Sequence, residues 1–154
     1  MSSRFVFLDT SGIYPIFSPN EHSKELCRNI LKDLLEVYNA NLITTNWIHY
    51  EVLSKLRKHG LEFCIRFEEL IKKGVLTIHK VDKDLETKGV QMFWAYKDKS
   101  WGVIDCVSFS FMHQKNIFYS LTMDDHFLQA GFYPLIKIDH KNKPYKSYSD
   151  ILFY

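Results

Sequence analysis

Short apolar runs alternate with helical segments along nearly the whole chain, and this alternation constrains the fold more than any other feature. The runs with strand character are Arg4–Leu8, Asn41–Thr44, Val75–His79, Ile117–Thr122 and Tyr133–Ile138. Apolar residues in most of the intervening segments recur at helical spacing, and parallel strands need long, usually helical crossovers between them. The sequence therefore predicts an α/β fold, with a mainly parallel central sheet and helices on both faces.

The helical segments are marked by their apolar stripes and by the residues at their ends. Leu26, Ile30 and Leu34 form such a stripe, and Gly60 and Gly74 fit the ends of two helices. The expected helices are Ser23–Tyr38, Thr45 or Asn46 to Lys58, Leu61–Lys73, Asp82–Tyr96, Val103–Gln114 and the short Asp124–Ala130. The Gly, Pro and Ser residues of Ser11–Pro19 favour a loop or a short helix.

The length of 154 residues suits one domain, and 46% hydrophobic with 25% charged residues is typical of a globular chain. We expect a domain over residues 1–138 and a basic, aromatic tail over 139–154. No apolar run reaches the length of a signal peptide's core or a membrane span, so we predict a cytoplasmic protein that does not enter membranes. Cys27, Cys64 and Cys106 lack metal-site spacing and are expected to be buried thiols.

The net charge of +2 is too small to predict nucleic-acid binding by itself. Basic side chains do gather locally in three places, at Lys55, Arg57, Lys58 and His59, at Lys72 and Lys73, and at Lys137, Lys141, Lys143 and Lys146. Each group could follow a phosphate backbone, and each is equally well explained as a solvated surface.

Two carboxylates stand directly after predicted strands. Asp9 ends the first strand and Asp124 follows the fourth. In an open parallel sheet, ligands bind beyond the carboxyl ends of the strands, so these side chains are expected to face one crevice. Asp105, at a helix start, and Glu51, beside the apolar stripe of its helix, are further candidates, because a carboxylate at a buried stripe needs a partner or a metal.

Each of these acids also has a purely structural explanation. Asp9 could cap a helix, Asp105 could interact with a helix dipole, and Asp124 could be a turn residue. Glu51 could pair with Lys55 one helical turn later. Four carboxylates in one crevice would repel one another, however, and a hard cation such as Mg²⁺ or Mn²⁺ would relieve that repulsion. Such a site suits metal-assisted phosphodiester hydrolysis.

Four stretches resemble the PIN-domain ribonucleases, in particular VapC-like toxins and their free-standing relatives. They are FLDTSG from Phe7, IHYEVL from Ile48, YKDKSWGVIDCVSF from Tyr96 and LTMDDHFLQAGF from Leu121. The resemblance covers residues 4 to about 136, and its last two stretches are the more specific. It implies a PIN-like three-layer sandwich and an endoribonuclease that uses Mg²⁺ or Mn²⁺.

Carried over by position, the resemblance implies catalytic, metal-binding acids at Asp9, Glu51, Asp105 and Asp124. It also implies site-lining roles for Thr10, Ser11, Thr122 and Asp125, of which Asp125 could replace or assist Asp124. The implied partners are an RNA substrate, an antitoxin protein if the chain is a toxin, and a second copy in a homodimer. The apolar segments Leu26–Leu35 and Ile65–Leu70 are expected to form the protein-binding surface.

Two rival functions remain open at this point. A haloacid-dehalogenase-like phosphatase also has an aspartate after its first strand, but it needs a second one two residues later, where this chain has Ser11. A catalytically silent PIN-fold module that binds RNA or protein is the other rival.

We further expect Asp98 to be a loop or supporting acid and His126 a surface residue rather than a ligand. Most of Trp47, Trp94 and Trp101 should pack in the core.

Overall fold

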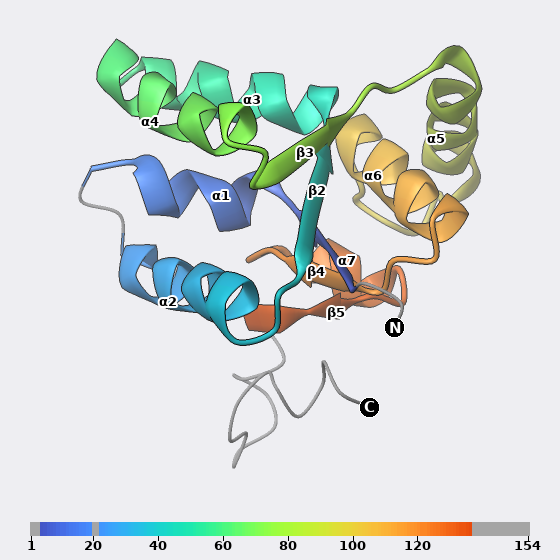
Figure 1. The fold of residues 1–154 in the computed structure, drawn as a ribbon. Coiled ribbons are helices and arrows are strands. Elements are labelled where there is room, and N and C mark those ends of the chain that lie inside the picture. The colour runs from blue at the N-terminus through green and yellow to red at the C-terminus, as the bar shows by residue number, and fades with distance from the viewer. Residues whose placement is uncertain (1–3, 20–21, 137–154) are drawn as a thin grey trace.

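The computed structural model describes residues 4–19 and 22–136, and it arranges them as a five-stranded parallel sheet between two layers of helices (Figure 1). The strands are β1 (Phe5–Leu8), β2 (Asn41–Thr45), β3 (Leu76–His79), β4 (Tyr119–Leu121) and β5 (Tyr133–Pro134). The helices are α1 (Thr10–Phe17), α2 (Lys24–Glu36), α3 (Asn46–Arg57), α4 (Leu61–Lys72), α5 (Lys83–Ala95), α6 (Val103–Gln114) and α7 (Asp125–Gln129). The predicted α/β fold, with a parallel sheet between layers of helices, is confirmed.

The order of strands across the sheet is β3-β2-β1-β4-β5, and every pair is parallel. The chain moves outward from β1 through β2 to β3 and then crosses to the other side of β1 to form β4. The strand order therefore reverses between β1 and β4. In open parallel sheets this reversal opens a crevice at the carboxyl ends of the two strands, where ligands bind.

Helices α1 to α4 cover one face of the sheet, and α5, α6 and α7 cover the other (Figure 1). Aromatic side chains fill the second interface. The Phe7 ring of β1 lies 6.0 Å from Phe111 of α6 and 6.2 Å from Phe127 of α7, and Phe109 packs edge-on against Phe127 at 4.9 Å. All four rings are fully buried, so this core fixes α6 and α7 relative to β1.

Most predicted boundaries are met within one or two residues, and the differences have local causes. Most of Ser11–Pro19 belongs to helix α1, which starts at Thr10, directly after Asp9, because Ile13 and Ile16 are buried and hold it to the body. Strand β5 ends at Pro134, which pairs with Ser120 at the sheet edge, where a residue without an N–H is tolerated. Leu135 and Ile136, which the sequence placed in this strand, are helical instead. The predicted end of that strand at residues 137–138 and the tail 139–154 lie outside the described residues.

Two further expectations concern side chains. The three cysteines are buried thiols, as predicted. Trp101 is buried and Trp47 half-buried, but Trp94 is 70% exposed, because it lies on the outer side of α5. Within the described part of the chain, no helix is both long enough and apolar enough to cross a bilayer.

Candidate active site

Asp9 occupies the carboxyl end of β1, at the point where the strand order reverses. It is 5% exposed and takes the N-cap position of α1, yet within the described structure its side chain makes no capping hydrogen bond. Its Oδ2 instead accepts hydrogen bonds of 2.8 Å from Ser11 Oγ and from Thr122 Oγ1. Because both hydroxyls use Oδ2, a ligand could bind Oδ1 without breaking either bond. The simple capping role for Asp9 is therefore wrong.

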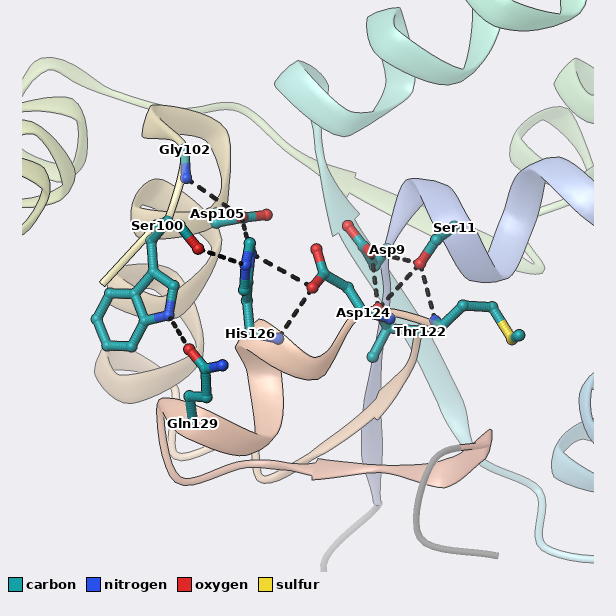
Figure 2. A network of polar contacts seen from close by, with 11 residues as sticks. Asp9, Ser11, Ser100, Gly102, Asp105, Thr122, Asp124, His126 and Gln129 are labelled. Atoms are coloured by element: carbon teal, nitrogen blue, oxygen red, sulfur yellow. Dashed lines mark hydrogen bonds and ion pairs between the residues drawn. The ribbon is translucent and has the colours of Figure 1, made fainter. Parts of the chain in front are cut away.

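The hydroxyls around Asp9 tie β1, α1 and the end of β4 together (Figure 2). Ser11 Oγ and Thr122 Oγ1 lie 3.0 Å apart. Ser11 Oγ accepts from the Met123 amide at 2.8 Å, and Thr122 Oγ1 accepts from the Asp124 amide at 3.0 Å. Each hydroxyl thus fixes the chain segment that carries the neighbouring acid, and both Ser11 and Thr122 donate to Asp9.

Asp105 and Asp124 approach Asp9 from two other helices. Asp105 stands in the first turn of α6, where Oδ2 accepts from the Gly102 amide at 3.3 Å. Asp124 is the N-cap of α7, where Oδ1 accepts from the His126 amide at 2.9 Å. Figure 2 shows Asp124 between Asp9 on one side and His126 on the other. Both acids do have the local helix-end roles considered for them, and the fold also directs them to one place.

The charges of Asp105 and Asp124 affect the pKa of the Asp9 carboxyl. Burial raises the pKa of the Asp9 carboxyl from 3.8 to about 6, hydrogen bonds from Thr122 and Ser11 act in the opposite direction, and the charges of Asp105 and Asp124 raise it further. Burial also raises the pKa of Asp105, and Asp124 adds to that rise. These carboxylates therefore lie close enough together to disfavour their own ionisation.

Glu51 reaches the site through Thr10. Its Oε1 accepts a hydrogen bond from Thr10 Oγ1, and Thr10 directly follows Asp9 in the chain. No ion pair between Glu51 and Lys55 is present in the described structure, and the Lys55 ammonium instead lies 5.6 Å from the Tyr14 ring. The structure thus brings Asp9, Asp105 and Asp124 into one cluster, and Glu51 is connected to it by its hydrogen bond with Thr10, the residue after Asp9.

His126 is the residue that the sequence assigned wrongly. Rather than lying on the surface, its ring is half-buried, with Nδ1 2.9 Å from Asp105 Oδ2 and 3.3 Å from Asp124 Oδ1. Its Nε2 lies 3.3 Å from Ser100 Oγ. The spacing of Asp124 and His126 at one helix start was a usable signal, because two such residues share a turn. Nothing in the sequence singled out Ser100.

Two other acids lie further out. Asp98 is 73% exposed and forms an ion pair of 3.4 Å with Lys99, so it does not support the cluster. Asp125 is exposed beside Asp124 and lines an open hollow of about 510 Å³. Ser11, Met123, Asp124, His126 and Gln129 are the other residues that line this hollow.

The donor set fits a divalent cation. Asp105, Asp124 and His126 can place one ligand atom each within 4.8 Å of one another. Among the described residues, no lysine or arginine forms an ion pair with Asp9, Asp105 or Asp124. Clustered carboxylates without such a partner favour a hard cation, and Mg²⁺ and Mn²⁺ prefer oxygen ligands.

One of the comparisons with known proteins bears on the fold. No protein-family model matches the chain, and no curated protein matches it. A solved structure does: VapC20 of Mycobacterium tuberculosis, described as a toxin that cleaves the sarcin-ricin loop, superimposes with a TM-score of 0.74 at 21% sequence identity. The match covers 82% of this chain and 95% of VapC20. The chain therefore has the fold of a VapC toxin, with Asp9, Asp105 and Asp124 gathered where its strand order reverses.

Proposed function

We propose that the protein is an endoribonuclease that uses Mg²⁺ or Mn²⁺ to hydrolyse phosphodiester bonds of RNA. The observation that carries the proposal is the convergence of Asp9, Asp105 and Asp124 at the strand reversal. The fold supports the choice of RNA, because the structurally similar VapC20 is an RNA-cleaving toxin. Fold alone does not define function, so the acidic cluster is the stronger support.

In this proposal the three aspartates hold the cation, and Glu51 completes the set from α3. A divalent ion at such a site supplies an activated water and offsets negative charge on the phosphate and the leaving oxygen. Ser11 and Thr122 keep the Asp9 carboxylate in one orientation, and Thr10 does the same for Glu51. Orientation matters because small displacements of a catalytic group lower rates strongly.

The open hollow beside Asp124 is the proposed place for the scissile phosphate. It is lined by polar groups on the side of the acids, with Ser11, Asp125 and Gln129 around its edge. An open hollow suits recognition of RNA by its overall form. We propose, by analogy with VapC20, that the chain acts as the toxin of a toxin–antitoxin pair.

The phosphatase alternative is disfavoured by the surroundings of Asp9. The nucleophilic aspartate of a haloacid-dehalogenase-like phosphatase is followed by an acid two residues later, and that position holds Ser11, whose hydroxyl donates to Asp9 itself. The silent-module alternative keeps the fold but predicts no cleavage. A cleavage experiment distinguishes this silent module from the proposed enzyme.

The test compares Asp9→Asn and Asp105→Asn with the parent in cleavage of a structured RNA, with Mg²⁺ or Mn²⁺ present. Each variant preserves shape but removes one charge from the cluster, so cleavage should fall by at least about a hundredfold, because even groups that only support metal ligands contribute factors of ten to a hundred. Products should carry 5′-phosphate and 3′-hydroxyl ends. Chelation with EDTA should stop the parent's activity.

Asp98→Asn is the matched control, since Asp98 is exposed and pairs with Lys99 away from the cluster. It should retain activity within about threefold of the parent, as surface substitutions have small effects. Equal activity of Asp9→Asn and the parent, in preparations free of contaminating nuclease, would remove Asp9 from the mechanism. Metal binding without any cleavage would favour the silent module.

A further inference from the structure

His126 stands beside the carboxylates that the proposed function assigns to the cation. This inference rests on that proposed function. We infer that His126 Nδ1 is itself a ligand of the cation, together with Asp105 and Asp124, and that this nitrogen gives the site a preference for Mn²⁺ over Mg²⁺.

The spacing of the three side chains matches neighbouring ligands on one ion. His126 Nδ1 lies 2.9 Å from Asp105 Oδ2 and 3.3 Å from Asp124 Oδ1. Ligands at about 2.1 Å from an octahedral ion are roughly 3 Å apart when they occupy adjacent positions. The distances from Nδ1 to the two carboxylates therefore match the separation of adjacent ligands on one ion. Only small side-chain movements are needed for all three groups to bind it.

The other nitrogen of the ring has the partner that a ligating histidine needs. Nε2 lies 3.3 Å from Ser100 Oγ, which can accept the Nε2 proton. In the metal-free chain Nδ1 lies within hydrogen-bond distance of Asp105 Oδ2 and can donate to it. When the cation binds, donation from Nε2 to Ser100 Oγ leaves the Nδ1 lone pair free for the ion, and metal-ligating histidines usually have such a partner on their second nitrogen. The His126 amide also donates to Asp124 Oδ1 at 2.9 Å, which keeps that carboxylate beside the ring.

The preference for Mn²⁺ follows from the chemistry of the donor. Mg²⁺ takes almost only oxygen ligands. Mn²⁺ also favours oxygen, but as a transition-metal ion it accepts an imidazole nitrogen more readily than Mg²⁺ does. A site made of carboxylates alone would discriminate less between Mg²⁺ and Mn²⁺. One imidazole among the aspartates would therefore raise affinity for Mn²⁺ selectively.

Pulsed electron paramagnetic resonance on the full chain loaded with Mn²⁺ tests the ligand directly. We expect modulation of the echo by a directly coordinated ¹⁴N nucleus, and we expect the pattern to change when only the histidines are labelled with ¹⁵N. Bound Mn²⁺ that shows no histidine nitrogen coupling would overturn the inference and leave the proposed nuclease intact. Failure to bind Mn²⁺ at all would overturn both.

A calorimetric titration of His126→Asn adds a quantitative check. The asparagine amide keeps an N–H near the place of Nδ1, so a hydrogen bond to Asp105 can persist while the imidazole is lost. Mn²⁺ affinity should fall at least about tenfold and Mg²⁺ affinity by less than about threefold, by the scale typical of changes around metal ligands. His22→Asn, at an exposed turn, is the matched control and should change neither. Equal losses for both ions would contradict the preference.

Discussion

Asp9 carries a charge in a place that is unfavourable for one. Its carboxyl is 5% exposed, and the nearby acids Asp105 and Asp124 oppose its ionisation. The two hydroxyls that donate to Asp9 offset this only in part, because the pKa remains raised to about 6. Catalytic sites often contain a buried group with a raised pKa, whose charge a bound ligand can stabilise.

The raised pKa predicts how the stability of the metal-free protein depends on pH. In the folded chain Asp9 keeps its proton up to about pH 6, but in the unfolded chain it loses it near 3.8. The contribution of Asp9 to folding is therefore fully present below about pH 4 and is lost as pH rises to about 6. The loss is about 3 kcal/mol, at about 1.4 kcal/mol per pKa unit.

Asp9→Asn should remove this dependence, because the amide does not ionise. Chemical denaturation with EDTA present should show the variant gaining stability relative to the parent between pH 4 and pH 7. Asp98→Asn, at an exposed site, should follow the parent at every pH. A constant difference between Asp9→Asn and the parent across this range would contradict the raised pKa.

At the scale of the elements, three helices begin at the acidic cluster. Asp9 precedes α1, Asp105 lies in the first turn of α6, and Asp124 precedes α7. Helix N-termini carry a partial positive charge, so they reduce the repulsion among carboxylates gathered there. The connection from β1 to α1 is a single residue, Asp9, which leaves its side chain little freedom to move away.

Gly12 allows α1 to lie directly against β4. A Cβ at this position would stand 2.2 Å from the Leu121 carbonyl oxygen, and backbone cannot move aside as a flexible side chain can. Gly12→Ala should therefore lower the free energy of unfolding by about 2–3 kcal/mol or more, as overpacking does, and should also disturb the Ser11 and Thr122 hydroxyls. Urea denaturation measures the first effect, and metal titration measures the second.

Gly102→Ala is the control for this prediction. Gly102 has no atom within 4 Å of an added Cβ, so the change should cost less than Gly12→Ala. Equal stability of Gly12→Ala and the parent would show that α1 can shift away from β4 without loss, and the close approach would then not be needed for the site.

At the scale of the whole molecule, much of the apolar surface expected to bind a partner is used inside the chain. Ile30, Leu31 and Leu34 of α2 and Phe67 of α4 are buried, so the sheet takes up more of these residues than the sequence pattern suggested. Ile65 of α4 is still 57% exposed, and Leu26 of α2 is 37% exposed. Association with a second copy or an antitoxin stays a prediction, and it now depends on these two positions.

Ile65→Lys should weaken self-association without unfolding the chain, because it places a charge on an exposed apolar position. Light scattering at high concentration should show a dimer for the parent and a larger monomer fraction for the variant. Lys72→Ile, at an exposed position of the same helix, is a control that should not reduce the dimer fraction. A monomeric parent at all concentrations would rule out self-association through this surface.

The elements themselves were predictable from the sequence, because apolar periodicity and end signals are local. Helix α6 runs over Val103–Gln114 as predicted, and Thr45 caps α3 by accepting from the Ile48 amide. Asp9 and Asp124 were found in the same local way, since each follows a strand. Asp105 and Glu51 were candidates because of their positions on helices, and the resemblance then separated them from ordinary helix acids.

Only the tertiary structure decided which of these residues meet. Pairing of β1 with β4 joins segments more than 110 residues apart, and it is this pairing that lets Thr122 donate to Asp9. The turn of the His126 ring toward Asp105 likewise depends on the packing of Phe127 and Phe109, which sets α7 against α6. Such contacts depend on how the elements pack in space. The sequence pattern of one segment does not show which distant segment will pack against it.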